Sequence, residues 1–105
     1  MSTKINVTPG VKQARYLRVL ADQRSLSRRM TGAKQPESLA GWRIARLVAS
    51  PRQATSRDNI EVQPAMWVMQ AHGWVEPGEV TPRGGKTWQI TDLGVAALEI
   101  AEGVR

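Results

Sequence analysis

Two cations flank a pair of glycines in a turn-rich segment, and this arrangement suits contact with phosphate. Arg83 and Lys86 stand on either side of Gly84-Gly85, so the tip of the loop is thin. A cation on such a tip can enter a narrow minor groove or hold a backbone phosphate. The alternative is that both charges are solvated, as charges in tight turns commonly are. Arg83 and Lys86 are therefore candidate DNA-binding residues.

A set of polar residues upstream of this loop is suited to reading bases. Arg, Asn and Gln side chains form paired hydrogen bonds to base edges in a major groove. Arg57 is the best single base reader in this set. Arg15 and Arg18, on an earlier helix, could contact phosphates or belong to a solvated or oligomerising helix face. The candidates of the upstream set are Arg52, Arg57, Asn59 and Gln63.

Trp67 and Val68 support a different function. The family resemblance described below implies a helix over residues 62–72 in which both side chains are exposed to some degree. Trp67 either packs against the N-terminal helix or forms a protein-binding surface with Val68. A protein-interaction module is therefore the alternative to a DNA-binding protein. The same resemblance implies that the buried residues of this helix are Val62, Ala65, Met66 and Met69.

The chain offers little for catalysis or metal binding. It has one histidine, His72, and no cysteine, which excludes disulfides, thiol catalysis and Cys-based zinc sites. Glu76 and Glu79 form a carboxylate pair, but an exposed hairpin lacks the apolar pocket that separates carboxylate pKa values. We expect no enzyme activity, no metal and no cofactor.

Positive charge is concentrated in the first sixty residues. Residues 1–60 hold twelve Lys and Arg against three Asp and Glu, a formal charge of +9. Residues 61–105 hold three against six, a formal charge of −3. Each cation laid on a phosphate releases a condensed counterion, so this asymmetry favours a surface turned towards a polyanion. We expect that polyanion to be double-stranded DNA.

The loop with Arg83 and Lys86 requires a β-hairpin to hold it. Val75 begins one strand, Pro and Gly residues provide the turn, and residues 87–90 alternate as a second strand does. Upstream, Gly73 suits the left-handed cap of a helix that ends at His72. We expect Trp74 and Trp88 in the core between these elements.

Two helices are predicted in the N-terminal half. A basic amphipathic helix covers residues 11–30, with Thr8 as a candidate cap and a looser end at 24–29. A linker at 31–36 leads to a second helix, which starts near Pro36 and stops at Ser50-Pro51. Its apolar side includes Trp42 and Leu47, and Arg43 and Arg46 face elsewhere.

Between this helix and the hairpin, the sequence predicts two short helices. Residues 52–61 form a helix or a loop with one helical turn, capped by Thr55 or Ser56, with Ile60 towards the core. Proline breaks helical hydrogen bonds, so the next helix is predicted to begin one or two residues before Pro64.

The segment from Met69 to Glu99 resembles bacterial winged helix-turn-helix regulators such as the MarR and PadR families. Met69 stands four residues before Gly73, and Thr91, Gly94 and Leu98 match a Thr-x-x-Gly-x-x-x-Leu pattern after the loop. The resemblance implies that residues 62–72 are a recognition helix and that the loop is the wing of a DNA-binding domain.

Length and composition agree with one small domain. We expect a flexible arm at 1–10 and a single winged-helix domain at 11–105, in which residues 37–102 form the core. The fold class is mainly α with a small β-hairpin, with additional N-terminal and C-terminal helices.

The chain has neither a membrane-spanning run nor a signal-peptide core, so we expect a cytoplasmic protein without membrane contact. The expected function is a transcriptional regulator or accessory factor of a bacterium or phage. The alternative is a phage-encoded modulator of a host protein. A homodimer stays open, because the first helix must pack on the last helix within or between chains. The contacting residues would be Leu93, Val95, Leu98 and Ile100.

Overall fold

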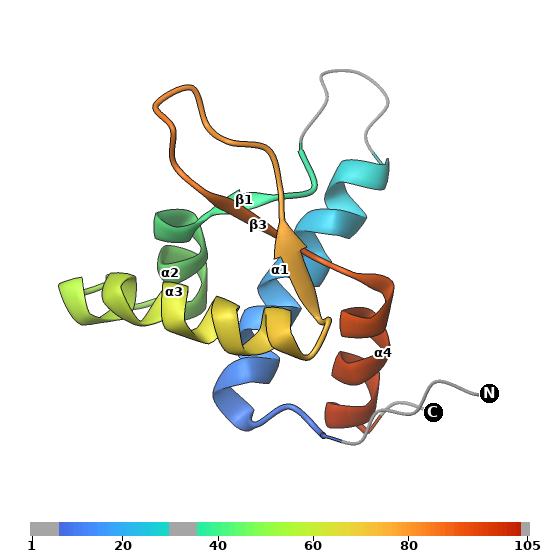
Figure 1. Ribbon diagram of the computed structural model, residues 1–105. Coiled ribbons are helices and arrows are strands. Elements are labelled where there is room, and N and C mark those ends of the chain that lie inside the picture. The colour runs from blue at the N-terminus through green and yellow to red at the C-terminus, as the bar shows by residue number, and fades with distance from the viewer. Residues whose placement is uncertain (1–6, 30–35, 104–105) are drawn as a thin grey trace.

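Figure 1 shows the computed structural model, which describes residues 7–29 and 36–103. Over these residues it is mainly helical, with four helices and a three-stranded antiparallel sheet, so the predicted fold class is confirmed at this level. Most of the predicted arm and linker lies outside the described residues. The elements are α1 (Val11–Arg29), β1 (Leu39–Ala40), α2 (Gly41–Ala49), α3 (Ser56–Ala71), β2 (Val75–Pro77), β3 (Thr87–Ile90) and α4 (Asp92–Ala101).

α1 is a long helix that begins at a glycine. The Gly10 N–H donates a hydrogen bond of 2.9 Å to the side chain of Gln13, so Gly10 rather than Thr8 is the cap. The predicted looser end at 24–29 is wrong, because α1 continues to its last described residue. Two arginines in its last turn interact favourably with the negative end of the helix dipole. The residues that α1 buries are Tyr16, Leu17 and Leu20.

β3 is the central strand, with β1 and β2 on either side of it. The antiparallel pairing of β2 with β3, with Val75 opposite Ile90, confirms the predicted hairpin. β1 was not predicted, because a helix was expected to start near Pro36. The backbone of β1 instead pairs with β3, and α2 begins only after it.

α2 ends at Ser50-Pro51, as predicted. Trp42 and Leu47 are 57% and 43% exposed, so placing them on the buried side was wrong. Their helical positions lie to either side of the buried residues rather than among them. The residues that α2 buries are Ile44, Ala45, Val48 and Ala49.

α3 is one helix of 16 residues where two helices were predicted. Thr55 is its cap: the Thr55 hydroxyl accepts a hydrogen bond from the Asp58 N–H, and the Asp58 carboxylate accepts one from the Thr55 N–H. This reciprocal capping box starts the helix at Ser56, and the helix then runs through the predicted boundary at residue 62. Ile60 is 72% exposed, so its predicted place in the core was wrong.

Pro64 lies inside α3, not in its first turn. Proline cannot donate to the carbonyl four residues earlier, which belongs to Ile60. Both residues are exposed, so the lost hydrogen bond lies on the side of α3 that faces solvent. Packing on the other side keeps the helix continuous. The residues that α3 buries, Val62, Met66 and Met69, confirm the predicted core side.

The end of α3 follows the prediction. Gly73 has a φ of +79°, the left-handed conformation expected of a glycine after a helix. The Gly73 N–H donates to the Gln70 carbonyl and the Trp74 N–H to the Met69 carbonyl, each at 2.9 Å. His72 is the C-cap residue, and its ring stacks on that of Trp74 with centroids 4.4 Å apart.

One hydrophobic core receives side chains from every helix and strand. Trp74 and Trp88 are buried in it, as predicted. α1 packs on α4 within the chain, where Leu98 is buried and Ile100 is 51% exposed. No helix in the described part of the chain is long and apolar enough to cross a membrane.

Candidate nucleic-acid interface

The loop between β2 and β3 carries Arg83 and Lys86 on a tip that Thr81 closes. The Gly84 N–H donates to the Thr81 carbonyl and the Gly85 N–H to the Thr81 hydroxyl, each at 2.8 Å. Gly84 has a φ of +84°, which glycine adopts without steric penalty. The tip is therefore a defined turn, and both cations on it are exposed.

The base of this loop is fixed against Ser38, the residue before β1. Gly78 lies so close to Ser38 that a Cβ atom on residue 78 would be 2.3 Å from the Ser38 Cβ. The Gly78 N–H donates to the Thr87 carbonyl at 3.0 Å, and the Thr87 hydroxyl donates to the Glu79 carbonyl. Ser38 and Thr87 are both buried. The loop therefore leaves the sheet at a fixed place.

α2 lies beside the loop and adds two cations. Arg43 and Arg46 are three residues apart, so they share the exposed side of α2. A groove of about 620 Å³ separates the start of α2 from the loop, and its lining includes Arg43, Arg83 and Glu79. We call four residues on these two elements the basic surface: Arg43, Arg46, Arg83 and Lys86.

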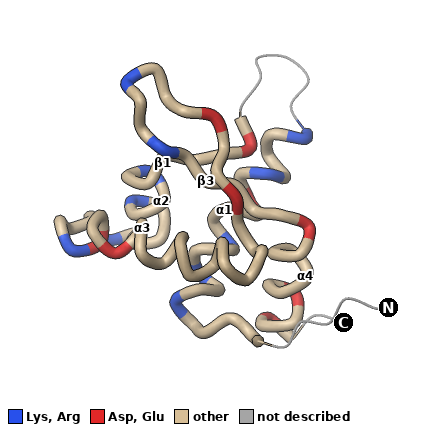
Figure 2. Tube along the Cα trace, in the orientation of Figure 1, with Lys and Arg blue, Asp and Glu red and all other residues tan. Residues whose placement is uncertain are grey.

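Figure 2 shows how charge is distributed over the described residues, with Asp and Glu also on the loop and at the start of α3, and with Lys and Arg also along α1. Positive segments of the loop, α2 and the start of α3 lie along the left side of the view, and α4 on the right is marked by negative charge. Of the positive charges in residues 1–60, those of α2 lie beside the loop, whereas six others belong to α1.

The four cations of the basic surface have no carboxylate partner in the part of the chain that the structure describes. Arg43 lies over the Trp42 ring, 5.7 Å from its centroid. Over residues 7–29 and 36–103, Arg15 and Arg29 donate to backbone carbonyls. The other described cations form ion pairs; they are Lys12, Arg18, Arg24, Arg28, Arg52 and Arg57. An anion can therefore bind the basic surface without displacing a carboxylate.

The predicted base readers gather at the start of α3, but Arg52 is held there. Its guanidinium donates two hydrogen bonds to the Asp58 carboxylate, at 2.7 and 3.0 Å. These bonds, followed by the bond from the Thr55 N–H, hold the pKa of Asp58 well below its usual range. Arg52 therefore completes the capping network of α3, and its link to DNA stays a prediction.

The other three candidates lie on the first turns of α3 and differ in how far they are engaged. Arg57 pairs with Glu61 at 3.2 Å, yet its side chain is 88% exposed, and such surface pairs are easily exchanged. Asn59 donates to the Thr55 carbonyl at 3.0 Å. Gln63 is exposed and makes no hydrogen bond with the described residues.

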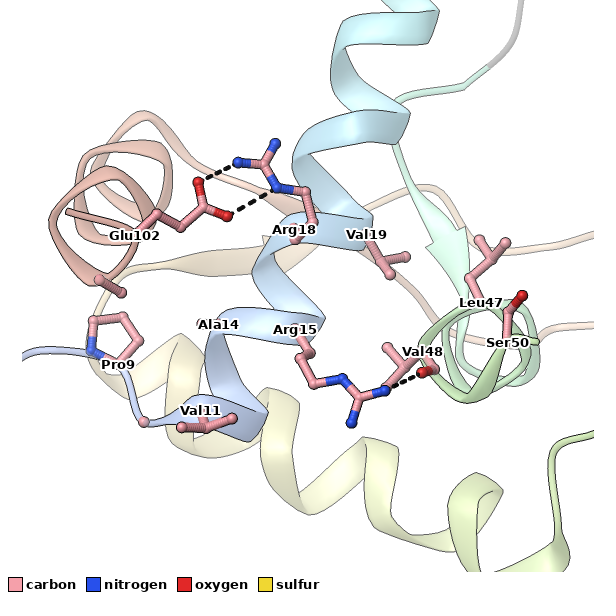
Figure 3. A pocket seen from close by; sticks show the side chains of 12 residues that line it. Pro9, Val11, Ala14, Arg15, Arg18, Val19, Leu47, Val48, Ser50 and Glu102 are labelled. Carbon is pink, nitrogen blue, oxygen red and sulfur yellow. Dashed lines mark hydrogen bonds and ion pairs between the residues drawn. The ribbon is translucent and has the colours of Figure 1, made fainter. Parts of the chain in front are cut away.

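Arg15 and Arg18 lie on α1 and point towards α2 and α4, as Figure 3 shows. Both line a cleft of about 550 Å³ formed by the start of α1 and the ends of α2 and α4. Arg15 donates to the Val48 carbonyl at 2.9 Å. Arg18 forms an ion pair with Glu102, which raises the pKa of the guanidinium. Both arginines tie α1 to its neighbours, and the structure does not bring them to the basic surface.

Sequence reasoning did not select Arg43 and Arg46 as site residues. Their spacing of three on one helix was the available signal, since it places both on one exposed side. What the sequence lacked was the position of the β2–β3 loop beside α2, because β1, which helps to position α2, was not foreseen.

Trp67 and Val68 are 53% and 49% exposed. α1 therefore does not cover Trp67, which was one of the two interpretations of this residue. The exposed side chain keeps the second interpretation open, a surface that contacts another protein chain.

Comparison of the chain with models of protein families, with curated proteins and with solved structures finds no match.

Proposed function

We propose that this protein binds duplex DNA as a small winged helix-turn-helix regulator or accessory factor. The order of its elements supports the proposal: a helix, a short strand, two helices joined by a turn, a hairpin with a long loop, and a last helix. In this proposal α2 and α3 are the helix-turn-helix, and the loop with Arg83 and Lys86 is the wing.

The observation that carries the proposal is the basic surface. Its four cations come from two neighbouring elements and have no carboxylate partner in residues 7–29 and 36–103, whereas cations elsewhere in these ranges are engaged. Binding a phosphate to such a cation releases a counterion and breaks no ion pair. The geometry is therefore better suited to a phosphate backbone than to any chemistry of catalysis.

The residues have different proposed roles. Arg83, on the thin tip, enters the minor groove or holds a phosphate, and Lys86 contacts the adjacent phosphate. Arg43 and Arg46 contact the backbone from α2. Arg57, Asn59 and Gln63 are the proposed base readers. Arg52 supports them by holding the first turn of α3.

The proposal is tested by fluorescence anisotropy of a labelled duplex at several salt concentrations. We expect micromolar or tighter binding that weakens steeply with salt. The Arg83→Gln/Lys86→Gln variant should reduce the slope of log K against log salt by about 1.8, since each phosphate contact contributes about 0.9.

The matched control is Lys12→Gln/Arg28→Gln, which removes the same charge from ion-paired residues outside the basic surface. It should leave the slope nearly unchanged. Equal losses in both variants would show that binding follows net charge and would contradict the proposed site. No binding at low salt would contradict the function and direct the search to an acidic protein partner of the basic surface.

A further inference from the structure

α3 has two apolar sides, and only one of them is covered by the rest of the chain. Its buried side faces the core, as described above. On the opposite side, five exposed apolar residues follow one another at spacings of four, three, one and three, which align on one face of a helix. We call this the outer face of α3; its residues are Ile60, Pro64, Trp67, Val68 and Ala71.

Single exposed apolar residues are ordinary, but a continuous apolar face with a half-exposed tryptophan marks a contact surface. Ile60, Trp67 and Val68 are 72%, 53% and 49% exposed. The outer face contains no cation of the basic surface and no group that binds phosphate. The proposed base readers Arg57 and Gln63 border the outer face on the same helix, so an occupant of this face and a major groove compete for α3.

We propose that the outer face of α3 packs against the outer face of α3 in a second copy of the chain, with the two helices antiparallel. The shape of the face supports pairing with a second copy of α3. Its bulky and small residues are arranged so that a twofold axis brings bulky ones opposite small ones. A twofold axis between residues 65 and 66 places Ile60 opposite Ala71 of the second copy and Trp67 opposite Pro64. Ile60 and Trp67 then each meet a small or flat side chain, as close packing of two helices requires, and Val68 lies opposite Gln63 at the edge of the face.

The charges at the two ends of α3 also favour an antiparallel arrangement of the two helices. Arg57, near the first turn, has a side chain that is 88% exposed, and the last turn of α3 has no basic residue of its own. In an antiparallel pair, Arg57 lies beside the C-terminal carbonyls of the other helix, where the helix dipole favours a cation. A parallel pair would place the two copies of Arg57 together.

The face is small, and this sets the strength of the association. From Ile60 to Ala71 it extends about 17 Å along the helix axis. Stable interfaces bury about 800 Å² on each partner and involve about 20–30 residues a side, whereas the outer face has five. We therefore expect a concentration-dependent dimer with a Kd on the order of micromolar rather than a permanent one.

Sedimentation equilibrium of the full chain, without DNA, tests the proposal. The mass should rise from 11.6 kDa towards twice that value between about 1 and 300 μM, a range that brackets the expected Kd. Trp67→Gln should keep the chain monomeric over this range. Trp42→Gln removes an equally exposed tryptophan outside the outer face and should leave the dimer intact. Near-ultraviolet circular dichroism checks that both variants are folded.

Three results would overturn the proposal: a monomer at every concentration, a dimer that survives Trp67→Gln, or equal loss of the dimer in both tryptophan variants. The outcome is separate from that of the DNA test, because the Arg83→Gln/Lys86→Gln variant should dimerise as the unchanged chain does.

Cross-linking tests the antiparallel arrangement. Because the chain has no native cysteine, only the introduced cysteines can react. With a short bismaleimide, a mixture of Ile60→Cys and Ala71→Cys chains should form a covalent dimer. Ile60→Cys alone should not, because the two copies of residue 60 lie at opposite ends of the face. Efficient linking of Ile60→Cys alone, without linking in the mixture, would contradict the antiparallel pair.

Discussion

Gly94 lies against the backbone of Trp74, so closely that a Cβ atom on residue 94 would be 2.1 Å from the Trp74 carbonyl oxygen. This contact joins the first turn of α4 to the residue before β2. The Thr91 N–H donates to the same carbonyl at 3.0 Å, and the Thr91 hydroxyl accepts the Gly94 N–H at 3.0 Å. The start of α4 is thus fixed to the end of α3 through backbone atoms, which cannot move aside as a side chain can.

Gly94→Ala should therefore lower the free energy of unfolding by about 3 kcal/mol or more, because the added methyl group forces backbone apart. Gly41→Ala is the matched control, since Gly41 is also in the first turn of a helix and its added Cβ would lie 3.7 Å from the nearest atom. That variant should be as stable as the unchanged chain or slightly more so. Chemical denaturation measures both; a neutral Gly94→Ala would contradict the close contact.

The pattern after the loop could be found in the sequence because each residue in it has a local role. Thr91 caps α4, Gly94 allows the close approach to Trp74, and Leu98 is buried one helical turn later. A helix cap, a glycine at a close contact and a buried apolar position can each be predicted from the residues next to them in the sequence. The hairpin, the cap at Gly73 and the burial of Trp74 and Trp88 were predictable for the same reason.

The boundaries of α3 and the strand β1 were not predictable in this way. Pro64 and the polar residues 52–61 argue locally for two short helices, but the packing of Val62 and Met66 in the core sustains one. Leu39–Ala40 becomes a strand only because β3 offers a backbone partner from a residue range nearly fifty positions later. Tertiary contacts override local propensity in both cases.

The number of charged residues can be read from the sequence, but which of them form ion pairs cannot. In the sequence, Arg18 and Arg46 cannot be distinguished, because both are arginines on amphipathic helices. The structure pairs Arg18 with Glu102, 84 positions away, and leaves Arg46 without a carboxylate partner among the described residues. Candidate binding residues could thus be named by type, and only the fold separates the engaged ones from the others.

Pro64→Ala should stabilise the protein. The substitution restores the N–H that donates to the Ile60 carbonyl and removes the clash of the ring with that turn, a gain of roughly 2 kcal/mol in a helix interior. Denaturation at a concentration where the chain is monomeric separates this effect from self-association. Pro82→Ala, in the loop, should instead lower stability by less than about 1 kcal/mol. A destabilised Pro64→Ala variant would contradict a regular helix through residue 64.

Asp58 should remain ionised in acid where an ordinary aspartate, with a pKa of 3.8, is largely protonated. Because the pKa is lowered in the folded state, ionised Asp58 stabilises the fold above that ordinary value. The stabilisation is lost as the pH falls from about 4 towards the lower folded pKa. Carboxyl chemical shifts measured by NMR between pH 2 and 7 follow the titration.

Arg52→Gln should raise the pKa of Asp58 towards its ordinary value, because the guanidinium of Arg52 is the main cause of the shift. Arg57→Gln is the control, since Arg57 pairs with Glu61 rather than Asp58. An unchanged pKa in Arg52→Gln would assign the shift to the Thr55 N–H instead.

Substitution of Arg18 should change the stability of the protein, whereas substitution of Arg83 should change its affinity for DNA. Arg18 bridges α1 to α4 through Glu102, so Arg18→Gln and Glu102→Gln should be coupled in a double-mutant cycle. Both side chains are partly exposed, which limits the coupling to about 0.5–1 kcal/mol. Arg83→Gln should leave stability unchanged, because its side chain makes no hydrogen bond or ion pair with the described residues.

The same two variants, titrated with duplex, should give the opposite result: Arg83→Gln weakens binding and Arg18→Gln does not. Both remove one positive charge, so a net-charge effect cancels in the comparison. Equal weakening, together with no coupling between Arg18 and Glu102, would mean that Arg18 is available to phosphate in solution. The DNA-contacting surface would then extend along α1, and the distinction between paired and unpaired cations would not define it.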